Sequence, residues 1–242
     1  MDGTIEILSI PVDNVSMEEA TEFVFNCIEE GKAASIATAN AEMLMRARED
    51  SELARILKDS DMVVPDGAGV LWAAEQQGRK FKERVAGVDL AYAVMKNCVV
   101  KGTKIYFFGG APGIAETAAA NMRAQVGELN IAGMHDGFFT AAEEQSIVND
   151  IRNSGAQVLF VALGVPKQEK WISRHLYELG PCVCMGVGGT FDVLAGKVCR
   201  APEWMRRNRL EWLYRLCKEP SRAWRMLALP KFVAAVKFGS NS

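Results

Sequence analysis

Residues 157–179 read QVLFVALGVPKQEKWISRHLYEL, and this stretch decides the fold class. Its first part, 157–163, is a short apolar run with β-branched side chains, which is typical of a buried strand. A polar turn follows at 164–169, and apolar side chains then recur at helical spacing up to residue 179. The stretch therefore predicts a strand, a glycine-containing turn and a helix, which is the repeating unit of a parallel α/β sheet.

The same alternation extends outward in both directions and covers the chain up to about residue 195. Ser16 with Glu19, and Thr140 with Glu143, form capping boxes that open two of the helices. The predicted strands are 6–9, 34–38, 62–64, 104–108, 130–133, 157–163 and 183–187, and the predicted helices lie near 16–30, 41–58, 67–77, 88–100, 113–126, 141–153 and 167–179. We therefore predict an α/β domain, residues 1–196, with a parallel sheet and flanking helices.

The composition limits which classes of protein this chain can belong to. The chain has 242 residues, 49% hydrophobic and 24% charged, which suits one main domain with an appendage. No basic segment precedes the first apolar run and no apolar run reaches about 18 residues, so we expect neither a signal peptide nor a spanning helix. The six cysteines show no C-x-x-C spacing and the two histidines lie far apart. We expect a cytoplasmic protein with buried free thiols and no zinc site.

Residues 197–242 differ in charge from the rest of the chain. They hold 11 Lys/Arg and 3 Asp/Glu, a net charge of +8, whereas residues 1–196 carry 17 basic and 27 acidic residues, a net charge of -10. A helix over 203–218 would place Met205, Trp212 and Leu213 on one face, and a second helix from Ser221 would stop at Pro230. Arginines interleaved with tryptophans favour a basic amphipathic appendage on an anionic membrane surface. A nucleic-acid partner is disfavoured by the acidic remainder of the chain.

Polar and glycine-rich residues follow six of the predicted strands. The carboxyl ends of parallel strands share one edge of a sheet, and ligands bind there. Glycines let backbone amides approach a phosphate closely. The residues singled out at this edge are Thr38, Asn40, Asp66, Gly109, Gly110, Gly164, Gln168 and Asp192, with Arg84 in a following loop. Structural alternatives remain open: Asn40 could cap a helix, Asp66 and Asp192 could be turn residues, and Arg84 could be a solvated cation.

Six blocks of sequence in order resemble the WecG/TagA/CpsF glycosyltransferase family over about residues 5–195. The blocks are TANAE (38–42), VPDG (64–67), RVAGVD (84–89), FFGG (107–110), LGVPKQE (163–169) and GVGGTFD (186–192). The resemblance implies a Rossmann-like core and an inverting transfer from a UDP-sugar to a lipid-diphosphate-linked acceptor on the inner face of a bacterial plasma membrane. It also implies N-acetylmannosamine as the donor sugar, undecaprenyl-diphosphate-GlcNAc as the acceptor and wall teichoic acid as the pathway.

The resemblance also implies roles for single residues. Asp66 would be the general base, and Thr38, Asn40, Arg84 and Gln168 would surround the donor sugar and diphosphate. Asp192 would hold the ribose or uracil. The looser resemblance of the basic appendage suggests that it lies on the membrane, where Arg215, Arg222 and Arg225 would reach the diphosphates.

The chemistry of these residues agrees with that assignment. An aspartate is ionised at neutral pH and can deprotonate an acceptor hydroxyl, and a guanidinium can offset the charge on departing UDP. The D-x-D sequence, 59–61, precedes its strand and so lies at the wrong edge for a catalytic metal, so we expect no metal and no other cofactor. An NAD-dependent oxidoreductase is disfavoured because FGGAPG (108–113) is not G-x-G-x-x-G and comes late in the chain. N-acetylmannosaminuronic acid or another hexose as donor, and self-association, remain open.

Overall fold

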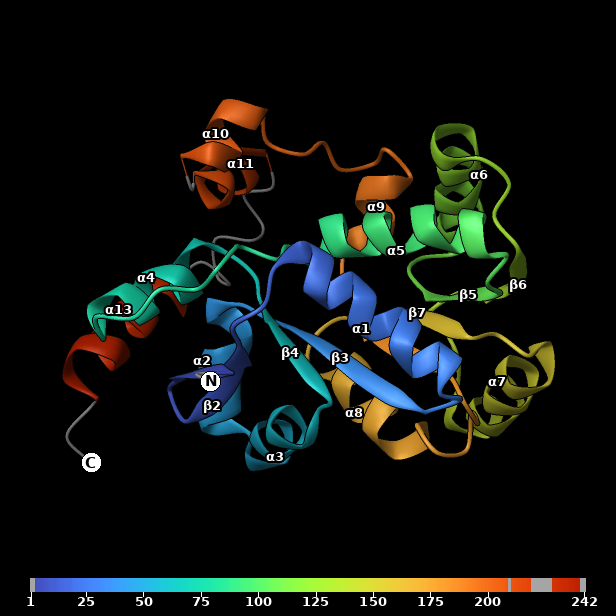
Figure 1. The fold of residues 1–242 in the computed structure, drawn as a ribbon, viewed down its shortest axis with the longest axis horizontal. Coiled ribbons are helices and arrows are strands. Elements are labelled where there is room, and N and C mark those ends of the chain that lie inside the picture. The colour runs from blue at the N-terminus through green and yellow to red at the C-terminus, as the bar shows by residue number, and fades with distance from the viewer. Residues whose placement is uncertain (1–2, 209, 219–227, 240–242) are drawn as a thin grey trace.

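The computed structural model describes residues 3–208, 210–218 and 228–239, and a parallel sheet lies at its centre (Figure 1). The six strands follow the order β4-β3-β8-β7-β5-β6, and each neighbouring pair is parallel. The strands are β3 (Ala34–Ala39), β4 (Met62–Pro65), β5 (Ile105–Gly109), β6 (Ile131–His135), β7 (Val158–Ala162) and β8 (Val183–Gly186). The predicted α/β class with a Rossmann-like parallel sheet is confirmed.

Helices cover both faces of the sheet and make separate apolar cores with it. One core joins Phe107 and Phe160 of the sheet to α1 (Met17–Glu29), α5 (Gly87–Lys101), α6 (Ile114–Val126) and α9 (Thr190–Leu194). The other face packs Phe108 and Val161 against α7 (Ala141–Ser154) and α8 (Lys167–His175). Figure 1 shows α5 and α6 on one side of the sheet and α7 and α8 on the other. Burial on both faces explains why these strands are almost wholly apolar.

The N-terminal residues differ from the prediction. The expected sheet strand at 6–9 is wrong, because β1 (Thr4–Ile7) and β2 (Ile10–Asp13) pair with each other as an antiparallel hairpin outside the main sheet. Leu8 and Ser9 form the turn with φ values of +50° and +66°. Two consecutive residues with positive φ match the twist of a tight hairpin, so the chain reverses here. The buried side of the hairpin joins the core around β4.

One predicted helix is divided in two. The single helix expected over 41–58 is α2 (Ala41–Glu49) followed by α3 (Ser51–Asp59), because the Asp50 side chain accepts a hydrogen bond from the Leu53 amide at 3.0 Å and caps a new helix. The next helix is α4 (Ala68–Gln76), which starts directly after β4 and its turn. The capping boxes at Ser16 and Thr140 are confirmed.

The C-terminal residues contain α10 (Glu203–Arg207), α11 (Glu211–Lys218) and α13 (Ala228–Phe238) where the structure describes them. The expected single helix over 203–218 is thus two helices. The expected stop at Pro230 is also wrong, because Pro230 lies in the first turn of α13, where a missing amide costs nothing. Residues 219–227 of the second predicted helix lie outside the described residues.

The helix α13 packs on the core, whereas α10 and α11 present apolar side chains to solvent. Phe232 of α13 is fully buried against α2 and α4. Trp204, Trp212 and Leu213 are exposed. Two of the thiols expected to be buried are exposed: Cys199, which precedes α10, and Cys217, which lies on α11. Within the described ranges, no helix has the length and apolar character needed to span a bilayer.

Candidate active site

The loops that follow the parallel strands meet at the carboxyl edge of the sheet, as predicted. In the order of the strands from β4 across to β6, this edge presents Asp66, Asn40, Gly188, Gly164, Gly110 and Asp136. The D-x-D sequence lies at the opposite edge, between the end of α3 and the start of β4. There Asp61 accepts hydrogen bonds from the amide and hydroxyl of Ser35 at 2.8 and 3.2 Å, which ties β4 to β3.

Asp66 lies in the turn between β4 and α4. Its amide donates to the Ala39 carbonyl at 2.8 Å, which fixes the backbone beside the end of β3. Its carboxylate accepts from the Gly87 amide at 3.2 Å and lies 3.6 Å from Nη2 of Arg84. Gly67, with φ of +86°, lets the chain turn into α4 directly after it. Asp66 is thus held where the strand ends, with about a quarter of its side chain exposed to the edge (24%).

Arg84 precedes α5 and faces two carboxylates. Its Nη2 lies 2.8 Å from Oε2 of Glu211, on α11, and 3.6 Å from Oδ1 of Asp66. Burial acts to lower the pKa of Arg84, but the nearby carboxylates outweigh burial and raise it. Arg84 therefore remains a cation inside the site. The sequence analysis missed Glu211, although an acidic residue in a strongly basic segment was a signal that could have drawn attention to it.

Thr38 and Asn40 lie at the end of β3, next to Asp66. The Thr38 hydroxyl is buried and reaches the Gly186 carbonyl at 3.5 Å. Asn40 caps α2, since its Oδ1 accepts from the Met43 amide at 3.0 Å. A Cβ on Gly67 would lie 3.9 Å from the Asn40 Cβ, so the two loops are in contact. The structural reading of Asn40 as a cap is confirmed, and contact with a sugar stays a prediction.

Gln168 joins two loops at the middle of the edge. Its Oε1 accepts from the amides of Gly164 at 3.1 Å and Gly188 at 2.9 Å. Its Nε2 donates to Oε1 of Glu169 at 2.7 Å. The Gln168 side chain is buried, so in this structure it braces the loops after β7 and β8. Burial raises the pKa of Glu169 to about 7, although the Gln168 hydrogen bond acts to lower it.

An open cleft of about 570 Å³ lies beyond β5, β6 and β7. Gly109 has φ of +116° and Gly110 has φ of +76°, and a Cβ on Gly109 would lie 2.5 Å from the Ala162 carbonyl. These glycines bring the backbone to the floor of the cleft, where the Gly110 carbonyl accepts from the Gly137 amide at 2.8 Å. The cleft is lined by Gly110, Gly137, Phe138, Phe139, Thr140, Glu143, Ala162, Leu163 and Lys167. The sequence analysis missed Phe138, whose side chain is 73% exposed.

Asp192 lies in α9, and of the three C-terminal arginines singled out from the sequence only Arg215 belongs to a described helix. Asp192 is partly buried in α9, next to Phe191, and a Cβ on Gly110 would lie 3.7 Å from the Phe191 ring. Asp192 itself is not among the residues that line the cleft. Arg215 is part of α11, while Arg222 and Arg225 lie outside the described residues.

A second pair ties this C-terminal segment to the core. Arg200 forms a bidentate ion pair with Asp89 in the first turn of α5. Its Nη1 lies 2.5 Å from Oδ1 and its Nη2 lies 2.8 Å from Oδ2 of Asp89. The sequence analysis did not single out Arg200. Among the described residues, no group of three His, Cys, Asp or Glu side chains is placed to hold a metal ion.

Comparison with known proteins adds to this geometry. Residues 5–239 match the family described as "Glycosyl transferase WecG/TagA/CpsF family". The chain is also 33% identical over 222 residues to an enzyme of Bacillus spizizenii, covering 90% of this chain and 86% of that one. The name of that enzyme is N-acetylglucosaminyldiphosphoundecaprenol N-acetyl-beta-D-mannosaminyltransferase.

Proposed function

The chain belongs to the WecG/TagA/CpsF family of glycosyltransferases, and from this premise we propose that it transfers N-acetylmannosamine from UDP-N-acetylmannosamine to undecaprenyl-diphosphate-GlcNAc. The product would be the ManNAc-β-GlcNAc linkage unit of wall teichoic acid. Similarity to the Bacillus spizizenii enzyme supports the acceptor and the transferred sugar. The observation that carries the proposal is the pairing of Asp66 with Arg84 at one end of an edge whose other end is an open, glycine-floored cleft.

Asp66 would act as the general base. The acceptor hydroxyl attacks the anomeric carbon of the donor, its proton passes to the Asp66 carboxylate, and the bond to UDP breaks with its electron pair on the phosphate oxygen. A single carboxylate suffices for inversion, because the attacking hydroxyl and the leaving group lie on opposite faces of the sugar. The Gly87 amide orients the carboxylate for this step by binding its other oxygen.

Arg84 and backbone amides would stabilise the departing diphosphate. A guanidinium can donate two hydrogen bonds to phosphate oxygens, and its charge offsets the charge that develops on UDP. The nucleoside would extend along the edge past Asp192 and into the cleft beside Phe138. We propose that this arrangement works without a divalent metal. Initial rates should survive excess EDTA, and a loss that magnesium or manganese restores would overturn this part of the proposal.

The C-terminal segment would hold the enzyme on the membrane that contains the acceptor. Trp204, Trp212 and Leu213 are exposed on α10 and α11, and α13 exposes Val233 and Phe238 beside lysines. Each basic side chain near an anionic surface contributes about 1 kcal/mol, so a net charge of +8 is enough for peripheral binding. Arg215, Arg222 and Arg225 would then reach the substrate diphosphates.

This membrane role is better tested by point substitutions than by removing the segment, because Phe232 is part of the core. Trp204→Ala with Trp212→Ala should weaken binding to anionic vesicles while turnover on a water-soluble acceptor analogue is retained. Unchanged vesicle binding would show that α10 and α11 are not the membrane contact.

A donor screen tests the function itself. UDP release would be measured with several UDP-sugars and a short-chain lipid-diphosphate-GlcNAc acceptor. We expect UDP-N-acetylmannosamine to be the preferred donor, with release dependent on the acceptor. Preference for UDP-N-acetylmannosaminuronic acid or another UDP-hexose would keep the chemistry and change the pathway, and absence of acceptor-dependent release would overturn the proposed function.

A further inference from the structure

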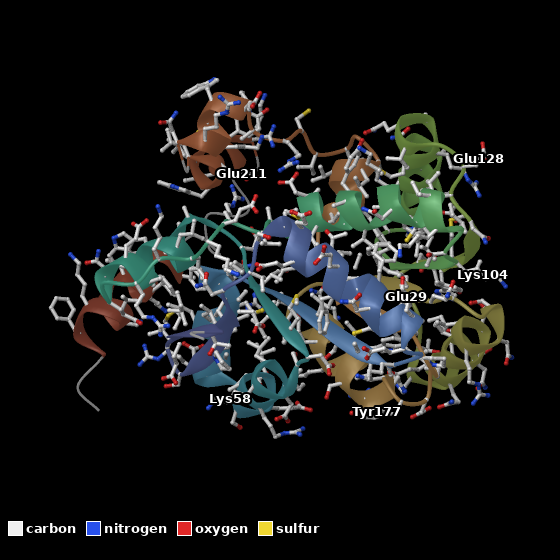
Figure 2. The ribbon with its side chains drawn as sticks, viewed as in Figure 1. Glu29, Lys58, Lys104, Glu128, Tyr177 and Glu211 are labelled. Carbon is white, nitrogen blue, oxygen red and sulfur yellow. The ribbon has the colours of Figure 1, made fainter. Side chains whose placement is uncertain are left out.

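Two ion pairs join the C-terminal segment to residues at the start of α5. The segment supplies the acid in one pair and the base in the other. The acid of one pair, Glu211, comes from α11 and binds Arg84 of the core. The base of the other pair, Arg200, comes from the same segment and binds Asp89 of the core. Figure 2 shows Glu211 on the side of α11 that faces the core. The segment is thus docked beside the site by specific charged pairs.

Glu211 pairs with Arg84, the residue that the proposed function assigns to binding of the donor diphosphate. The Glu211 carboxylate lies 2.8 Å from Nη2 of Arg84, and its side chain is only 9% exposed. The Nε of Arg84 is buried, and no described residue accepts a hydrogen bond from it. A phosphate binds a guanidinium through the same paired N–H groups as a carboxylate does. Glu211 therefore occupies a donor group that a diphosphate would use.

Glu211 and a donor diphosphate would oppose each other at Arg84. Both are anions, and two anions on one partly buried guanidinium repel each other more strongly than they would in water. A buried carboxylate that loses its partner also loses the interaction that makes its burial tolerable. Binding of the donor at Arg84 therefore favours departure of Glu211 from the site.

We propose that Glu211 is a built-in competitor of the donor diphosphate for Arg84, so that docking of α11 and binding of the UDP-sugar disfavour each other. The proposal rests on the proposed function, because it takes Arg84 as the diphosphate-binding residue. Arg200 lies near enough to Glu211 for their charges to interact, and its ion pair with Asp89 keeps the beginning of the segment attached while Glu211 moves. Donor binding then releases α11 from Arg84.

The competition predicts a change in UDP affinity. Coupling between two binding events is reciprocal, and couplings of this kind typically change affinity by about 5- to 150-fold. Glu211→Gln removes the competing charge and keeps the size of the side chain. The Kd of the full-length protein for UDP, measured by isothermal titration calorimetry, should fall by about 5-fold or more. Glu203→Gln, on the same segment with an exposed carboxylate paired to Arg207, should leave the Kd unchanged.

A second measurement uses the wild-type protein and does not depend on folding of the variant. Hydrogen exchange in peptides covering 203–218 should become faster when UDP is added, because Glu211 leaves Arg84. An unchanged or weaker UDP affinity of Glu211→Gln, or slower exchange of 203–218 with UDP, would overturn the competition. Wild-type protein that binds no UDP would instead remove the proposed function itself.

Discussion

The two ends of the carboxyl edge of the sheet are built in different ways. Beside β4, the functional groups are charged side chains that already pair with one another, as Arg84 does with Glu211 and Asp66. Beside β5 and β7, the edge is an open cleft whose floor is glycine backbone and whose rim carries the exposed ring of Phe138. A ligand has to exchange partners at the charged end, whereas it can enter the open end with little rearrangement.

This difference has a physical origin. Charged groups that are partly removed from water need partners. The charged side chains beside β4 therefore pair with one another when no ligand is present. Glycine has no side chain to fill a cleft, and its positive φ values hold the backbone in place without one. We therefore expect loss of the Asp66 carboxylate at the charged end to act mainly on turnover, and substitutions at the open end to act on affinity or on stability.

Asp66→Asn tests the charged end and should have the largest effect. The amide oxygen can still accept from the Gly87 amide, so the geometry is kept while the base is lost. Turnover should fall by about two to four orders of magnitude, the usual contribution of acid–base catalysis. UDP binding, measured by calorimetry, should persist. Activity within a few-fold of wild type would remove Asp66 from the mechanism.

Glu169→Gln tests the buried network between the two ends. Burial raises the pKa of Glu169 to about 7, above its unfolded value of about 4.3, so the carboxyl contributes stability that is present below about pH 4 and is lost as pH rises through about 7. The difference between the two pKa values corresponds to about 4 kcal/mol. Between pH 5 and pH 8, the free energy of unfolding measured in urea should fall less for Glu169→Gln than for wild type. The exposed Glu116→Gln is the control, and equal losses in all three proteins would contradict the prediction.

Gly109→Ala tests how the open end is shaped. A Cβ there would lie 2.5 Å from backbone atoms of Ala162, and the residue has φ of +116°, so the loop would have to shift. We expect a loss of about 2–3 kcal/mol in the free energy of unfolding, together with weaker UDP binding. Gly164 also has a positive φ, but a Cβ there would meet open space. Gly164→Ala should therefore lower the free energy of unfolding by only about 1 kcal/mol. Equal costs at the two positions would show that the backbone approach at Gly109 does not matter.

Phe138→Ala should have the smallest effect of the four. Its ring is exposed at the rim of the cleft, so its removal should leave stability unchanged. Loss of a ring stacked on the uracil would weaken UDP binding by about 2- to 10-fold. Tyr177→Ala is the matched control, because Tyr177 is 85% exposed and follows the far end of α8, whose first residue, Lys167, lines the cleft. An unchanged Kd for Phe138→Ala would show that the uracil ring does not stack on Phe138 and binds elsewhere along the edge.

The sequence was informative where neighbouring residues decide the structure. Helix starts at Ser16 and Thr140 were predicted from capping boxes, and a cap was one of the two alternatives for Asn40; the structure shows a cap at all three. Errors arose where a short segment had two local solutions. The hairpin at Leu8 and Ser9 lacks the usual turn residues, and Pro230 could either end a helix or stand in its first turn.

The sequence by itself determined that the strands are parallel and buried, and hence that Asp66, Asn40 and Gly110 lie on one edge, because the alternation of apolar strands, turns and helices is a local pattern. Only the tertiary structure decided which loops meet. Arg84 and Glu211 are 127 residues apart, and the Gln168 side chain reaches Gly188 across 20 residues. No local pattern encodes such contacts, because they depend on strand order and on how the C-terminal helices pack on the core.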